Sequence, residues 1–197
     1  MSTGKGIIAS AFFEPPAGGL ILSDNFNRSD AASLGANWTS ASSWSIVSNQ
    51  ASKSGTDDYT VYTTTLGTPD HWSEFQLTAS NAGAYLVVNA RRPSGTDNTT
   101  NATGYLFFVD PGSFAPTIGN SIGGSYSTLI TGTALGGWPA SGVIRIEVSG
   151  TTIRGLVNNV QVVSTTDSSI TTGNFAGFNC NFNVVDNWRA GTLPWTP

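Results

Sequence analysis

The sequence has 197 residues and a formal net charge of −4, with 10% charged and 39% hydrophobic residues. This length is typical of one domain, and the composition is too apolar and too weakly charged for intrinsic disorder. Twelve acidic residues against eight basic ones argue against the basic face that nucleic-acid binding requires. No apolar run approaches the ~20 residues of a membrane-spanning helix.

Residues 1–19 differ from the rest and are predicted to form an N-terminal arm. They end in a stiff, then flexible joint, Pro15–Gly19. The arm is too short to build a core, so we expect it to dock onto a neighbouring subunit, with folding back on its own domain or fraying as the alternatives. No clear cleavage site follows its apolar run, so no signal peptide is predicted. The residues predicted to anchor the arm to a partner are Ile7, Ile8, Phe12 and Phe13.

Residues 20–197 are predicted to form a single β-domain. Apolar and polar residues alternate with a period of two in the segments 74–79, 85–91 and 143–148, as in strands with one buried face. In the segment 105–109, large apolar residues point to both sides, which predicts a strand buried on both faces. Turns rich in Gly, Ser, Thr and Asn separate these segments.

Two tight turns organise the segment that follows residue 143. Ser149-Gly150 separates the first strand from a second, and Asn158-Asn159 separates the second from a third. Asparagine tolerates a positive φ, so Asn-Asn suits a two-residue hairpin. A three-stranded meander over 143–163 is therefore predicted. Because no segment has a helical apolar period longer than two turns, the fold class is all-β, an antiparallel β-sandwich or barrel.

Several short motifs carry a resemblance that spans roughly residues 22–191. They are Asp24–Asp30, Leu34–Trp38, Trp44–Ile46, Ala84–Arg91, Asp167–Gly173 and Val185–Gly191. With these motifs the sequence resembles concanavalin A-like (laminin-G-like) jelly-roll domains, which recur in bacteriophage structural proteins and bacterial carbohydrate-binding proteins. The resemblance implies a jelly-roll sandwich whose first and last strands pair. It implies little about function, because the same sandwich serves lectins, glycosidases and structural subunits.

Carboxylates suited to glycoside hydrolysis are missing. That reaction needs two carboxyl groups facing each other across a cleft, and relatives of this fold that cleave β-glucans carry a Glu-x-Asp-x-x-Glu type strand. The only glutamates are Glu14, Glu74 and Glu147, and none lies in such a motif. Glu147 shares its face with Arg145, which we interpret as a solvated strand face. The chain is therefore predicted not to be an enzyme.

The sequence also contains a short match to a hydrolase motif. Residues Gly119–Gly123 match Gly-x-Ser-x-Gly, the nucleophile elbow of hydrolases. An elbow needs a strand-turn-helix and a later histidine, whereas the only histidine, His71, comes earlier. We therefore attribute the match to chance in a sequence rich in Gly and Ser. With one histidine and no cysteine pair, no zinc site is predicted.

Asp24 and Asp186 are the candidate metal ligands. By alternation each carboxylate is predicted to lie on an inward face, where it must be paired, hydrogen-bonded or bound to a metal. Arg28 lies on the Asp24 face, so pairing with Arg28 is the favoured interpretation and a calcium site is the alternative. No other cofactor is predicted.

Aromatic residues are the candidate glycan-binding groups, because the face of a pyranose ring stacks on an exposed aromatic ring. Trp138, in a loop, and Tyr126, Tyr59 and Tyr62 are the predicted binding residues, with buried packing as the alternative for each. Three further tryptophans lie in the motifs of the resemblance and are expected in the core. They are Trp38, Trp44 and Trp188.

These features predict a non-catalytic, virion-associated structural protein, such as a phage capsid decoration, head-fibre or tail subunit. The arm would anchor it to other virion proteins, and the sandwich would display a polar surface that binds host-surface polysaccharide. Its expected location is the virion, after synthesis in the bacterial cytoplasm, and a homo-oligomer is expected. A free carbohydrate-binding module is the second hypothesis, and a glycoside hydrolase with an atypical site is the third.

Overall fold

A computed structural model describes residues 21–40, 43–54, 59–79, 85–96, 102–110, 112–137, 142–180 and 184–193. The predicted arm, with Ile7, Ile8, Phe12 and Phe13, lies outside the described residues, and so does Trp138.

The described residues form fifteen strands in two sheets and no helix, so none of them forms a helix able to cross a membrane. Sheet A contains β1 (Ile21–Asp24), β3 (Trp44–Val47), β4 (Gln50–Lys53), β6 (His71–Ala79), β11 (Gly142–Ser149), β12 (Thr152–Val157), β13 (Val160–Thr166) and β15 (Val184–Thr192). Sheet B contains β2 (Trp38–Ser40), β5 (Thr60–Tyr62), β7 (Leu86–Arg92), β8 (Gly104–Val109), β9 (Pro116–Ile122), β10 (Ser125–Thr131) and β14 (Phe175–Cys180).

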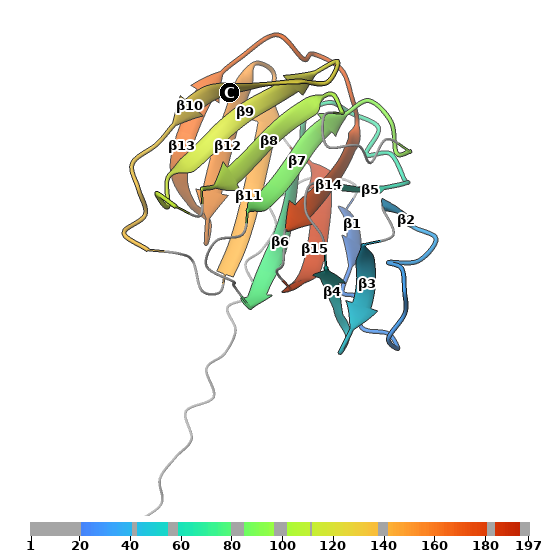
Figure 1. Cartoon of the computed structure of the whole chain (residues 1–197). Coiled ribbons are helices and arrows are strands. Elements are labelled where there is room, and N and C mark those ends of the chain that lie inside the picture. The colour runs from blue at the N-terminus through green and yellow to red at the C-terminus, as the bar shows by residue number, and fades with distance from the viewer. Residues whose placement is uncertain are drawn as a thin grey trace, which may run out of the picture.

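The two sheets stack as an antiparallel sandwich, which confirms the predicted fold class (Figure 1). Sheet A has the order β13-β12-β11-β6-β15-β4-β3, and β1 pairs with β15. Sheet B has the order β10-β9-β8-β7-β14-β5-β2. The first and last strands pair from Ile21 with Gly191 to Asp24 with Trp188, as the resemblance implied.

The predicted meander is confirmed in β11, β12 and β13, which pair in sequence within sheet A. Asn158 and Asn159 have φ values of 52° and 62°, so the hairpin between β12 and β13 uses the positive φ that asparagine tolerates. Gly150, in the preceding hairpin, has a φ of 54°.

The main core lies between the sheets and is rich in aromatic rings. Trp44 and Trp188 are fully buried and Trp38 is 6% exposed, so all three are core residues as predicted. Phe178 of β14 packs edge-on against both Trp38 and Trp44, with centroids 5.3 and 5.1 Å apart. Such edge-to-face pairs are favourable beyond the area they bury.

The outer face of sheet A carries a buried ion-pair network, which corrects the prediction of a solvated face around Arg145. Glu74 is 1% exposed and Arg145 4%. Arg145 Nε donates to Glu74 Oε2 at 2.6 Å, and Arg189 Nη2 donates to the other oxygen. The Arg145 guanidinium also lies 5.3 Å from the ring centroid of Trp72. Alternation placed these residues on the right side of the strand but did not predict their burial.

Candidate functional site

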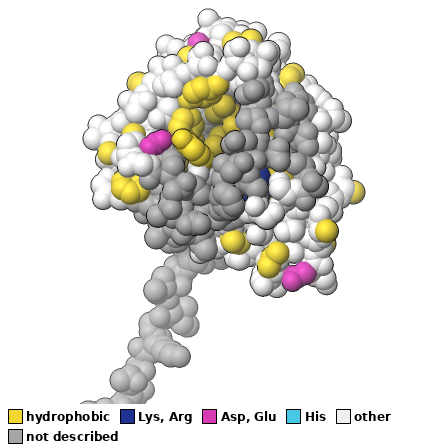
Figure 2. Space-filling model, in the orientation of Figure 1, with side chains coloured by type: hydrophobic (Ala, Val, Ile, Leu, Met, Phe, Trp, Pro, Cys, Tyr) yellow, Lys and Arg dark blue, Asp and Glu magenta, His cyan; other side chains and the backbone are white. Residues whose placement is uncertain are grey.

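The outer face of sheet B carries a second, smaller hydrophobic cluster. Along β7 and β8, Val87, Leu106 and Phe108 point away from the main core. Val87 and Leu106 are 5% and 4% exposed, and Phe108 packs against them. The prediction that the segment 105–109 is buried on both faces is therefore confirmed. Figure 2 shows hydrophobic side chains gathered over β8 and β9.

Three aromatic rings form a strip that runs diagonally across this face, which we call the aromatic strip: Tyr85, Phe108 and Tyr126. The ring centroids of Tyr85 and Phe108 lie 6.0 Å apart, and those of Phe108 and Tyr126 lie 6.2 Å apart. Tyr85 is 42% exposed and Tyr126 is 44% exposed. The strip therefore joins an apolar cluster to solvent, with tyrosine hydroxyls at both ends.

Tyr126 is held in place by a glycine and a threonine. A Cβ atom at Gly119 on β9 would lie 2.5 Å from Tyr126 Cε2, so the ring occupies the space of the missing side chain. The Tyr126 hydroxyl is 3.1 Å from Thr128 Oγ1, within hydrogen-bond distance. Burial raises the pKa of Tyr126, so its hydroxyl is neutral and able to donate at physiological pH.

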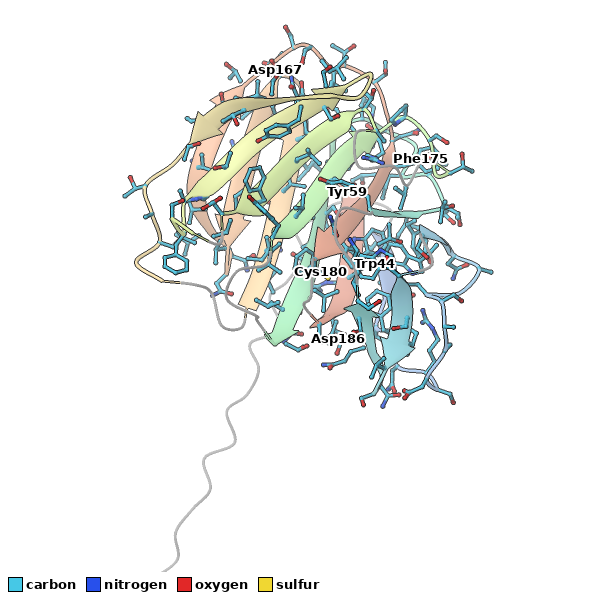
Figure 3. All side chains as sticks on the ribbon, in the orientation of Figure 1. Trp44, Tyr59, Asp167, Phe175, Cys180 and Asp186 are labelled. Atoms are coloured by element: carbon cyan, nitrogen blue, oxygen red, sulfur yellow. The ribbon has the colours of Figure 1, made fainter. Side chains whose placement is uncertain are left out.

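Tyr59 reaches the same face from the neighbouring part of the sheet. It immediately precedes β5, and Figure 3 shows it in front of β14. Its ring packs in one cluster with Val87 and Leu106, and the Arg92 guanidinium lies 5.4 Å from the ring centroid. Gly177 of β14 lies between Val61 of β5 and Asn89 of β7. Tyr59 is 6% exposed, so it forms part of the surface layer rather than a free platform.

Asn89 lies among the apolar residues on the outer face of sheet B. It points outward from β7, since Val88 and Ala90 on either side of it belong to the main core. The side chain is fully buried, and neither its Oδ1 nor its Nδ2 atom has a hydrogen-bond partner.

Of the four predicted glycan-binding residues, the three that the structure describes are not brought together. Tyr126 is exposed within the aromatic strip, and Tyr59 is buried nearby on the same face. Tyr62 is 8% exposed in the main core and stacks on Trp188 at 4.9 Å, so its ring faces are closed to a ligand. Sequence analysis did not single out Phe108, Tyr85 or Asn89 as binding residues. The sequence signal that could have pointed to this surface was the apolar character of both faces of the segment 105–109.

Asp24 is paired with Arg28, as the favoured interpretation of the sequence stated. Arg28 donates from Nη1 to Oδ1 at 2.8 Å and from Nη2 to Oδ2 at 3.0 Å, and Trp38 Nε1 donates to Oδ2 at 2.8 Å. Burial opposes ionisation, but these bonds hold the pKa of Asp24 below its usual range. Calcium binding by Asp24 would require Arg28 to leave.

Asp186, the second candidate calcium ligand, is in a different situation. Burial, opposed by a bond from the Asn187 amide and reinforced by the charge of Asp24, raises its pKa. Figure 3 places Asp186 at the end of the sandwich opposite Asp167. Within the described part of the chain, no group of three or more His, Cys, Asp or Glu side chains is arranged to hold a metal ion.

Neither the Gly-x-Ser-x-Gly match nor the glutamates Glu74 and Glu147 form a catalytic arrangement in the structure. Residues 119–123 lie in β9 and in the hairpin turn to β10, not in a strand-turn-helix, so the nucleophile-elbow match is a chance match. Glu74 has both carboxylate oxygens bonded to arginines. Glu147 lies 3.5 Å from Arg145 in the same network.

His71 is a buried structural residue at the start of β6. Its Nδ1 is 3.0 Å from the Thr68 carbonyl oxygen, and its Nε2 accepts from the Arg91 amide at 3.1 Å. These partners require a neutral ring with the proton on Nδ1. Burial lowers the pKa of His71 to about 4, so the neutral form is the one present at physiological pH.

Comparison with known proteins supports the fold only. No family model and no curated protein sequence matches the chain. Among solved structures, it is similar to the carbohydrate-binding module CBM66 from Bacillus subtilis, at 15% identity and a TM-score of 0.60, over 77% of this chain and 91% of that one.

Two further solved structures show the same architecture. The exoplasmic/lumenal domain of VIP36, in a form bound to Ca²⁺ and Man3GlcNAc, matches with 11% identity and a TM-score of 0.61, over 82% of this chain and 85% of that one. A prokaryotic β-1,3-1,4-glucanase (lichenase) derived from a mouse hindgut metagenome matches with 11% identity and a TM-score of 0.60, over 88% and 99%. The fold is thus the concanavalin A- and galectin-like jelly roll, which carbohydrate-binding and glycoside-hydrolase domains share.

Proposed function

We propose that this protein is a non-catalytic carbohydrate-binding sandwich whose binding surface is the aromatic strip on the outer face of sheet B. The observation that carries the proposal is the Tyr126 ring, which lies over Gly119 and is 44% exposed beside Phe108. Tyrosine rings combine an apolar face with a hydroxyl, which suits a ligand with both apolar and hydroxyl-bearing surfaces. Sugars are such ligands.

The similarity to CBM66 and to the glycan-bound VIP36 domain supports this proposal at the level of the fold. The lichenase, which is a β-1,3-1,4-glucanase, has the same fold. For this chain we propose binding without catalysis. The paired glutamates Glu74 and Glu147 lie on the outer face of sheet A, whereas the aromatic strip lies on sheet B.

The binding test compares the full chain with Tyr126→Ala on a printed array of polysaccharides and oligosaccharides. The array includes mixed-linkage β-1,3-1,4-glucan and a Man3GlcNAc oligosaccharide, and the strongest glycan is then measured by titration calorimetry. We expect Tyr126→Ala to weaken binding at least tenfold, about 1.4 kcal/mol. Val160→Ala is the matched control, because Val160 is 64% exposed on β13 of the other sheet. Unchanged binding by Tyr126→Ala would refute the proposed surface.

The absence of catalysis is tested with the same glycans by assaying new reducing ends. We expect no turnover. Turnover that disappears in Glu147→Gln would favour the glycoside-hydrolase hypothesis instead.

A virion location is a further proposal that rests on the sequence. The apolar residues of the segment 1–19, ahead of its Pro/Gly joint, would anchor the sandwich to other virion proteins of a bacteriophage, with synthesis in the bacterial cytoplasm. A free carbohydrate-binding module fits the fold equally well. Deleting residues 1–19 tests the virion hypothesis against the free-module hypothesis. If the arm is an anchor, the truncated chain should no longer be incorporated into particles. Normal incorporation of the truncated chain would refute the anchoring role.

A further inference from the structure

The surroundings of Asn89 are unusual for an asparagine. Its direct cross-strand neighbours are Leu106 on β8 and Gly177 on β14. Val87 precedes it by two positions on the same strand, and Arg92 follows beyond the positive-φ residue Arg91. Asn89 is thus enclosed by apolar side chains and one bare glycine.

Tyr59 covers Asn89. The Tyr59 ring packs in one cluster with Val87 and Leu106 and is faced by the guanidinium of Arg92. Val87 and Arg92 lie on the two sides of Asn89 along β7, and Leu106 lies opposite it on β8. From these positions we infer that the Tyr59 ring contributes to the cover of the amide.

Burying an amide without hydrogen-bond partners lowers the stability of the fold, and the structure shows no structural role of Asn89 that compensates for it. Buried polar side chains in native proteins are nearly always hydrogen-bonded, and an exception calls for an explanation such as a functional role. Asn89 does not connect elements, unlike Asn179 one strand away, whose Oδ1 accepts from Lys53 Nζ at 2.8 Å. An apolar residue would fit the cluster around Asn89 better.

The chemistry of the free amide matches that of a sugar. A primary amide accepts at Oδ1 and donates at Nδ2 side by side, which is complementary to two adjacent hydroxyl groups on one ring. Leu106 pairs with Asn89, and Phe108 is two residues further along β8, so the positions of Asn89 and Phe108 are diagonal neighbours, which lie about 7–8 Å apart in antiparallel sheets. One ligand can therefore reach both.

We propose that Asn89 is a ligand-binding residue, whose amide binds a pair of adjacent hydroxyls of a carbohydrate when the Tyr59 ring turns aside. This inference rests on the proposed function and adds a hydrogen-bonding subsite to the aromatic strip. It makes Tyr59 the cover of a subsite that is closed in the free protein.

The experiment uses the full chain, Asn89→Leu and Asn179→Leu. Binding is measured by calorimetry with the array glycan that gives the strongest signal. The side-chain amide resonances of Asn89 are identified by their absence from the Asn89→Leu spectrum, and the wild-type protein is titrated with the same glycan. We expect Asn89→Leu to remain folded and to bind at least tenfold more weakly, and the Asn89 side-chain amide signals to shift on titration.

The outcomes separate this inference from the proposed function. If Tyr126→Ala loses binding but Asn89→Leu binds like the wild type, or the Asn89 side-chain signals do not move, the inference is wrong and the proposed function stands. If the wild-type protein binds no glycan on the array, both are wrong. Asn179→Leu is the control for a buried, partnered asparagine, and its expected defect is lost stability.

Discussion

The ring of Tyr126 fills the space that a side chain at Gly119 would occupy. The two residues lie on the adjacent strands β10 and β9, and a Cβ atom at Gly119 would come within 2.6 Å of the Tyr126 hydroxyl oxygen as well as 2.5 Å of Cε2. The glycine thus allows the ring to lie down towards Phe108 instead of standing out from the sheet. This makes Gly119 a positioning residue for the proposed binding surface.

Gly119→Ala should displace the Tyr126 ring and weaken glycan binding. The added methyl group would also lie 2.8 Å from the Ser127 carbonyl oxygen, so we expect a loss of about 1–3 kcal/mol in the free energy of unfolding from overpacking. Binding is measured by calorimetry well below the unfolding temperature, and stability by urea titration. Gly137→Ala is the control, because no atom lies within 4 Å of a Cβ at Gly137. An unchanged affinity in folded Gly119→Ala would contradict the positioning role.

The sequence predicted much of the fold because its signals are local. Alternation identified the strand faces of 143–148, and the Asn158-Asn159 pair identified a hairpin. The aromatic strip could not be predicted in this way, because it depends on register between strands. Tyr126 and Tyr59 look alike in the sequence, but one ring lies at the surface over Gly119, whereas the other packs in the cluster with Val87 and Leu106.

The burial of polar side chains was also beyond local sequence analysis. Alternation tells on which side of a strand Arg145 lies, but not that Trp72 and Glu74 on β6 enclose it. Likewise, Asn89 is one polar position in an alternating segment. Its missing partners become visible only when β8, β14 and Tyr59 are in place around it.

Asn89→Leu should stabilise the protein. A buried polar group without a partner costs about 1–3 kcal/mol, and leucine has a similar size and suits the surrounding cluster. We therefore expect the free energy of unfolding to rise by about this amount, which corresponds to roughly 2–4 °C in Tm per kcal/mol for a chain of this length. Calorimetric melting curves of the wild type and the variant measure it. A lower Tm would mean that Asn89 has a structural role instead.

Glu74→Gln should strongly destabilise the sandwich. Glu74 is 1% exposed and bonded to both Arg145 and Arg189, so a neutral amide would leave the buried Arg145 charge with only the more distant Glu147, 3.5 Å away. Breaking a buried ion pair by removing one partner typically costs about 3–5 kcal/mol. Arg154→Ala is the control at the exposed edge of the same network, where the Nη1–Oε2 distance to Glu147 is 3.9 Å and about 0–1 kcal/mol is expected. Urea unfolding of both variants measures the difference, and equal effects would argue against a buried network.

His71 should make the protein less stable in mild acid. Its pKa is about 4 in the folded protein because of burial, against 6.5 for an unperturbed histidine, so between these values the unfolded chain binds the additional proton. The stability contribution is fully present above pH 6.5 and is lost as the pH falls towards 4, with a total of about 3 kcal/mol at ~1.4 kcal/mol per pKa unit. The free energy of unfolding should therefore fall across this range in urea titrations at successive pH values.

The matched variant for this pH dependence is His71→Gln. A glutamine carbonyl can still accept from the Arg91 amide, whose bond to His71 Nε2 is 3.1 Å long, but it does not titrate. The variant should be less stable than the wild type at neutral pH and should lose the decline between pH 6.5 and 4. Carboxylates with lowered pKa values, such as Asp24, titrate below their usual range and so contribute at more acidic pH. If the decline persists in His71→Gln, the histidine is not its source.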